Sequence, residues 1–146
     1  LGVEVQVFGR VSLAVSARCY HARAHGRTKD NCQFVCEEDP DGMPLRSRDD
    51  QPILRVNGIQ TQSESYLDLL PETPQLVADR VTHLRLMPQR VDMVAVAQVF
   101  RDAVDGRLSM GEADARLAAL SGDARLSNGF YHGAAGYRRI AAAALG

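Results

Sequence analysis

The chain has 146 residues, 45% of them hydrophobic, and its formal net charge is -1. That length and apolar content suffice for one globular domain with its own core. The near-neutral charge lacks the basic excess of a typical nucleic-acid-binding protein, so we expect no nucleic-acid partner. No apolar run is long enough to cross a bilayer and the first residues lack a secretory-signal pattern, which predicts a cytoplasmic protein without a transmembrane segment.

The first half of the chain is predicted to contain mainly strands and loops. Valines alternate with other residues over 3–7, which is typical of a strand, and Gly9 and Arg10 are expected to separate it from a second strand over 11–16. The polar stretch 37–52 carries prolines, a glycine and several acids, which predicts a solvated loop. A further strand is expected to begin at Ile53.

The second half combines one more strand with predicted helices. The strand is expected over 81–88, where Pro88 closes it, and the helices over 75–81, 93–106, 110–122 and 137–145. Strands combined with helices predict an α/β fold. Because only about four strands are visible and a closed parallel barrel needs eight strands and roughly 250 residues, the chain could supply only part of a barrel.

Three cysteines, Cys19, Cys32 and Cys36, are the most informative residues, because they cluster early in the chain and no other cysteine occurs. An odd number argues against a secreted disulfide framework. If the segment around Cys32 and Cys36 is helical, the two lie on one face with Cβ atoms about 5–6 Å apart. Soft thiolates of this kind suit zinc or an iron–sulfur cluster, and both commonly take four protein ligands.

The fourth ligand and the role of the cysteines stay open at this point. For zinc, His21 or His25 would complete a Cys3His site, whereas a cluster would ordinarily need another cysteine. The alternative is that the cysteines are small buried apolar residues and the charges around them form a solvated face. Basic side chains that would favour thiolates surround them, namely Arg18, Arg23, Arg27 and Lys29.

Other polar residues are interpreted as structural. Glu37, Glu38, Asp39 and Asp41 crowd a turn-rich stretch and are expected to face water. For His132, within an aromatic and glycine-rich stretch, packing is favoured over catalysis. The chain has no G-x-S-x-G elbow, no glycine-rich phosphate loop and no H-E-x-x-H zinc helix. No catalytic residue is therefore assigned.

Several segments nevertheless resemble one known family. "FGRVSLAVSARC", "KDNC", "VNGIQTQS", "LRLMPQ" and "NGFYHGAAG" are similar, in this order, to segments of the collagenase-like peptidase family, and the similarity covers essentially the whole chain. The resemblance implies that residues 1–146 are the C-terminal half of a TIM-barrel-like α/β domain, incomplete in this chain, with an iron–sulfur-binding segment at about 16–40. It also implies a 4Fe-4S cluster held by Cys19, Cys32 and Cys36, with a fourth cysteine upstream.

The resemblance further implies a function. The similar family members act with a second member, UbiU, as a heterodimer in the oxygen-independent hydroxylation of ubiquinone precursors. The chain would then be a component of a hydroxylase complex with a ubiquinone precursor as substrate. Two alternatives from other classes are a structural zinc-binding module and a hydrolase of the collagenase-like type.

Overall fold

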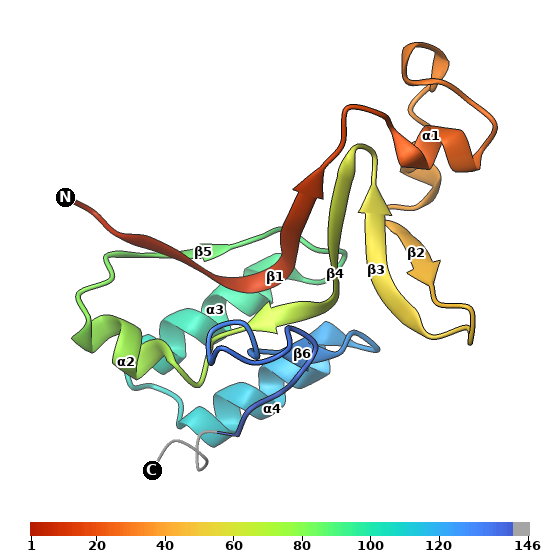
Figure 1. Cartoon of the computed structure of the whole chain (residues 1–146). Coiled ribbons are helices and arrows are strands. Elements are labelled where there is room, and N and C mark those ends of the chain that lie inside the picture. The colour runs from red at the N-terminus through yellow and green to blue at the C-terminus, as the bar shows by residue number, and fades with distance from the viewer. Residues whose placement is uncertain (142–146) are drawn as a thin grey trace. The chain divides into compact units, whose positions relative to one another are not determined.

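The structure is a computed structural model that describes residues 1–141 (Figure 1). The chain combines strands and helices, which confirms a mixed α/β fold. In chain order the elements are β1 (Glu4–Val15), α1 (Tyr20–Ala24), the 3-10 helices η1 (Lys29–Asn31) and η2 (Val35–Glu38), β2 (Met43–Arg46), β3 (Pro52–Asn57), β4 (Gln60–Asp68), α2 (Thr73–Ala78), β5 (His83–Leu86), α3 (Met93–Val104), α4 (Met110–Ser121) and β6 (Leu126–Ser127).

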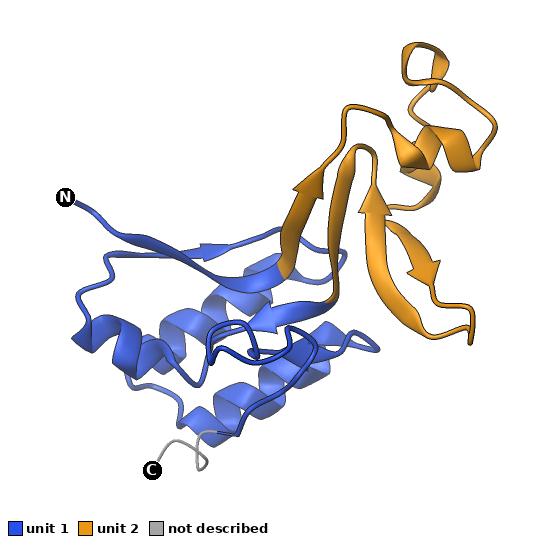
Figure 2. Ribbon diagram, in the orientation of Figure 1, with its two compact units in different colours: residues 1–9, 65–146 blue, residues 10–64 orange. Residues whose placement is uncertain are grey.

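The chain forms two compact units, and β1 and β4 each continue from one unit into the other. Unit 1 comprises Leu1–Gly9 and the chain from Ser65 onward, and unit 2 comprises Arg10–Glu64 (Figure 2). Among the described residues, no helix combines the length and the apolar character that crossing a bilayer requires. The sheet is open and mostly antiparallel. It does not confirm the expected TIM-barrel-like character, which stays a prediction.

Unit 2 is an antiparallel sheet with the strand order β2-β3-β4-β1. Strand β3 pairs with β2 on one side and with β4 on the other, and the β3–β4 hairpin turns at Gly58, whose φ of +60° suits glycine. The buried guanidinium of Arg10 donates to the carbonyl oxygen of Ser63 at 2.9 Å and to Asp41 Oδ2 at 2.6 Å. This arginine therefore ties β1 and β4 to the chain that leads into β2.

Unit 1 packs helices against a smaller sheet in which β1 lies between β4 and β5, and β6 pairs with β4. The β1–β5 and β4–β6 pairs are parallel. Phe8 is fully buried, and its ring makes edge-to-face contacts with Tyr66 at 5.7 Å and Phe100 at 6.2 Å between centroids. Helices α3 and α4 contact each other, and α3 brings Phe100 from the helical layer onto the ring of Phe8.

Both long helices begin where the sequence predicts and end one or two residues before the predicted ends. Asp92 Oδ1 accepts the Ala95 N–H at 3.0 Å at the start of α3, and Gly106 follows its end with a φ of +70°. Helix α4 begins with a capping box between Ser109 and Glu112. The structure thus confirms both predicted helices. They could be predicted because the residues that start and stop them are adjacent in the sequence.

The prediction of two strands over residues 3–16 is wrong. The chain forms one twelve-residue strand, β1, with an irregularity in its pairing to β5 between Gln6 and Phe8. Gly9 has a φ of +96°, and a Cβ atom there would lie 2.7 Å from the Met87 carbonyl oxygen. Glycine at this position therefore bends the strand without ending it, which is the behaviour of a bulge.

The terminal helix predicted over 137–145 is also wrong for the residues that the structure describes, and 142–146 lie outside the described residues. The carbonyl oxygen of Arg138 accepts the backbone N–H groups of Asn128 and Gly129. The Ile140 N–H donates to Asn128 Oδ1 at 2.7 Å. The backbone groups of Arg138 and Ile140 that a helix would use are thus already bonded to residues 128–129.

Candidate metal-binding segment

All three cysteines lie in one segment of unit 2, residues 16–40, between β1 and β2. Cys19 is the N-cap of α1, Cys32 is the C-cap of η1, and Cys36 lies within η2. Helix α1 contacts both η2 and β3, so the segment folds back on itself beside the sheet of its own unit. The segment expected from sequence is therefore a structured part of unit 2.

The three cysteines are free thiols and each is half-buried. The interpretation of these residues as fully buried apolar side chains is therefore wrong. Cys19 Sγ accepts the Ala22 N–H at 3.4 Å. The carbonyl oxygen of Cys32 accepts the guanidinium of Arg27 at 2.9 Å, which places one of the predicted basic side chains directly against the cysteine backbone.

The assumption that Cys32 and Cys36 share one helical face is wrong. Between them Gln33 and Phe34 have φ values of +49° and +53°, and each adopts the left-handed conformation that non-glycine residues rarely take. The chain therefore turns sharply between η1 and η2 instead of continuing as one helix. Two such residues in succession store conformational strain, and strain of this kind clusters at functional sites.

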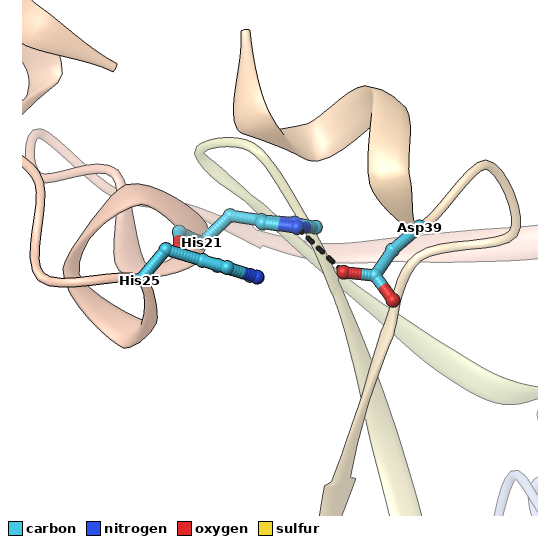
Figure 3. A group of neighbouring side chains, drawn as sticks. All are labelled: His21, His25 and Asp39. Carbon is cyan, nitrogen blue, oxygen red and sulfur yellow. Dashed lines mark hydrogen bonds and ion pairs between the residues drawn. The ribbon is translucent and has the colours of Figure 1, made fainter. Parts of the chain in front are cut away.

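A second group of potential ligands lies in the same segment. Among the described residues, His21, His25 and Asp39 form a group whose ligand atoms all lie within 4.8 Å of one another (Figure 3). His21 is fully buried, and its Nε2 atom lies 2.9 Å from Asp39 Oδ2. No cysteine belongs to this group, so the structure does not bring either histidine into a compact Cys3His arrangement.

Two of the four acids of this region face water as predicted, and two do not. Glu37 and Glu38 are exposed, whereas Asp39 and Asp41 are half-buried. Asp39 pairs with His21, and Asp41 pairs with Arg10 at 2.6 Å. The sequence carried no local signal for these pairs, because each partner lies about twenty or thirty residues earlier in the chain. Asp39 is thus a candidate ligand that the sequence pattern missed.

Unit 1 contains a separate buried polar cluster around Glu72. Its Oε1 atom accepts Asn128 Nδ2 at 2.7 Å and lies 2.8 Å from His132 Nε2. The Glu72 side chain is 6% exposed and that of His132 is 9% exposed. The Tyr131 ring packs edge-to-face on that of His132. These contacts hold the 128–140 segment in place, which agrees with the packing role predicted for His132.

Asp68 is the other buried acid of unit 1. Its side chain is fully buried, it accepts the Leu70 N–H at 2.8 Å, and it pairs with Arg139. Burial raises the pKa of Asp68 above its ordinary value of 3.8, and the guanidinium of Arg139 opposes that rise. Arg139 also contacts Asp114 Oδ1 at 2.5 Å, so this network ties the C-terminal segment to α4.

Taken together, these features define a mixed α/β protein whose segment 16–40 gathers three cysteines and two histidines. The family model described as peptidase family U32 matches residues 1–141, so the chain belongs to this family. The collagenase-like peptidase family predicted from sequence is thereby confirmed. No solved structure matches the chain.

Proposed function

We propose that the chain is part of a UbiV-like iron–sulfur protein that acts with a UbiU-like partner in the oxygen-independent hydroxylation of ubiquinone precursors. The observation that carries the proposal is the set of three free, half-buried cysteines in one folded segment of a U32-family chain. Soft thiolates are the usual protein ligands of iron–sulfur clusters. The segment similarities noted in the sequence supply the particular function.

The chemistry of the segment fits a 4Fe-4S cluster held by Cys19, Cys32 and Cys36. None of the three thiols is consumed by a disulfide, and none is sealed in an apolar interior. The Ala22 N–H at Cys19 Sγ is the kind of donor that stabilises a cluster sulfur ligand. The chain contains three cysteines, and the family resemblance implies that the fourth thiolate of such a cluster comes from an upstream cysteine outside these 146 residues.

The chain's own residues hold and tune such a ligand set. The Arg27 guanidinium donates to the carbonyl oxygen of Cys32 and so fixes the backbone there. The strained turn at Gln33 and Phe34 then sets the position of Cys36 relative to Cys32. The basic side chains of the segment offset the negative charge of a thiolate-bound cluster. When bound, a 4Fe-4S cluster supplies one-electron transfer, and the protein supplies binding, orientation and electrostatics.

Iron and sulfide analysis under anaerobic conditions tests the proposal. The protein joined to its upstream half is expected to be brown and to hold about four irons and four sulfides. Cys32→Ser should lose the colour and the iron, whereas Thr28→Ala should retain both, because Thr28 is exposed and its side chain makes no cap bond in the same segment. Iron content that is unchanged by Cys32→Ser would reject the cluster.

The collagenase-like hydrolase remains the second candidate, because the family description names a peptidase. It predicts peptide hydrolysis by protein that contains neither iron nor sulfide. A heterodimer with a UbiU-like partner is tested separately by co-purification of the two chains. A colourless protein that holds zinc through the cysteines would favour the structural zinc module instead.

A further inference from the structure

His21, His25 and Asp39 are brought together by the fold of the segment 16–40. His21 and His25 are four residues apart at α1, so their side chains project from the same face of the helix. Their rings stack with centroids 5.3 Å apart and an angle of 12° between the planes. Figure 3 shows both rings directed toward the Asp39 carboxylate, which follows η2.

Backbone carbonyl groups fix the same tautomer in both histidines. His21 Nδ1 lies 3.2 Å from the Val56 carbonyl oxygen, and His25 Nδ1 lies 3.0 Å from the His21 carbonyl oxygen. A carbonyl oxygen only accepts, so Nδ1 of each ring carries a proton. Each ring then presents Nε2 as its remaining ligand atom, which is the arrangement found in metal-binding histidines.

The Nε2 atoms and the Asp39 carboxylate converge on one place. His21 Nε2 lies 2.9 Å from Asp39 Oδ2, and the ligand atoms of all three residues lie within 4.8 Å of one another. Ligands about 2.0–2.1 Å from a tetrahedral zinc ion would be about 3.3 Å apart. To bind such an ion, His21 Nε2 and Asp39 Oδ2 must therefore separate by a few tenths of an ångström. The His25 ring must move closer to both, which its partly exposed side chain permits.

We propose that His21, His25 and Asp39 form a binding site for a divalent first-row transition-metal ion, separate from the cysteines. Two imidazoles and one carboxylate suit zinc or ferrous iron better than magnesium or calcium, which prefer oxygen ligands alone. The three residues leave at least one coordination position open. Glu38 lies near His25, with Oε2 3.9 Å from His25 Nε2.

Two features distinguish this group from a surface ion pair. His21 is fully buried and its Nε2 atom lies 2.9 Å from Asp39 Oδ2, whereas a surface ion pair exposes both of its side chains. The second imidazole is not needed for such a pair, yet it stacks on the first and presents its own Nε2 to the same carboxylate (Figure 3). The site also does not depend on the cluster proposed above, since it uses none of the cysteines.

Cobalt titration in a cysteine-free background tests the proposal. The whole protein carrying Cys19→Ser, Cys32→Ser and Cys36→Ser is expected to bind one Co²⁺ ion per chain, with visible bands and no sulfur charge-transfer band. Adding His25→Gln or Asp39→Asn should weaken binding at least about tenfold, the size of a typical loss around a metal site. Adding His83→Gln or Glu37→Gln should change nothing, because both residues are exposed and lie outside the group.

Zinc stoichiometry in the otherwise unchanged protein provides the second measurement, which does not need the cysteine-free variant to fold. His25→Gln and Asp39→Asn should each lower bound zinc by about one ion per chain relative to His83→Gln and Glu37→Gln, with circular dichroism unchanged. If substituting the cysteines removes the zinc ion that His25→Gln and Asp39→Asn remove, the proposal of a site separate from the cysteines is overturned. Unchanged stoichiometry in both ligand variants would overturn it as well.

Discussion

Cys19 Sγ accepts the backbone N–H of Ala22 at 3.4 Å, so a proposed cluster ligand is also the N-cap of α1. Two substitutions of Cys19 distinguish its role as a cluster ligand from its role as an N-cap. Serine replaces the sulfur by a good capping oxygen, whereas alanine removes the cap at a cost of about 1 kcal/mol. We expect both Cys19→Ser and Cys19→Ala to lose the cluster iron, and only Cys19→Ala to lower the free energy of unfolding.

Iron analysis and urea unfolding of the two variants check this prediction. Iron retained in Cys19→Ser would show that the thiol is a cap and no ligand. A Cys19→Ser variant that unfolds as easily as Cys19→Ala would show instead that the sulfur has a structural role that a hydroxyl cannot fill.

Asp41 compensates a buried charge in unit 2, and its removal should be costly. The Arg10 side chain is 3% exposed and donates to Asp41 Oδ2 at 2.6 Å. Hydrogen bonds to charged groups contribute about 1.5–3 kcal/mol, and Asp41 itself is partly exposed. Asp41→Asn should therefore lower the free energy of unfolding by about 2 kcal/mol in urea denaturation.

Asp49→Asn provides the matched control for Asp41→Asn, because Asp49 is an exposed acid in the same polar stretch. It should change the free energy of unfolding by less than about 0.5 kcal/mol. Equal effects of the two substitutions would contradict a specific contribution from the Arg10 pair.

Local signals in the sequence predict several elements correctly. The strand at Ile53 and the helices that begin at Asp92 and Ser109 carry their own turn and capping residues, and the structure confirms all three. The continuous β1 was missed because Gly9 bends a strand as readily as it ends one. Strand β2 was missed because its polar, proline-containing sequence is held in place by pairing with β3.

The candidate site also has a part that the sequence predicted and a part that it missed. The clustered cysteines drew attention to this part of the chain, and the family resemblance implied a binding segment at about 16–40. The partnership of His21 with Asp39 depends on the left-handed turn at Gln33 and Phe34, which returns the chain to α1. A reversal by two non-glycine residues has no sequence signature, so Asp39 looked like one solvated acid among several.

Asn128 anchors the C-terminal segment of unit 1, and its loss should loosen that segment. The fully buried amide donates to Glu72 Oε1 at 2.7 Å and to the Ile140 carbonyl oxygen at 3.0 Å, and it accepts the Ile140 N–H. Asn128→Ala leaves buried polar groups unpaired, each costing about 1–3 kcal/mol. We expect a loss of at least about 2 kcal/mol in unfolding free energy.

Hydrogen exchange shows where the effect of Asn128→Ala is felt. The Ile140 amide should lose its protection more than amides of α3, because its acceptor has been removed. Asn31→Ala, at an exposed position of η1, should leave both stability and exchange unchanged. Protection of Ile140 that survives Asn128→Ala would rule out the anchoring role.

Asp68 should make the stability of the protein depend on pH. Burial raises the pKa of this carboxyl above 3.8, and Arg139 opposes the rise. Between 3.8 and the raised pKa, the folded protein binds more protons at Asp68 than the unfolded chain does. The contribution of this group to the free energy of unfolding therefore falls as the pH rises through that window, and is most favourable below it.

Asp68→Asn removes this titration and keeps the size of the side chain. Its free energy of unfolding relative to the unsubstituted protein should accordingly improve as the pH rises from below 3.8 to 7, when both are measured by urea denaturation. Asp123→Asn, at an exposed position, should show a difference of less than about 0.5 kcal/mol throughout. A shift in favour of the unsubstituted protein with rising pH would mean that the ion pair with Arg139 outweighs desolvation, and that the pKa of Asp68 is lowered instead.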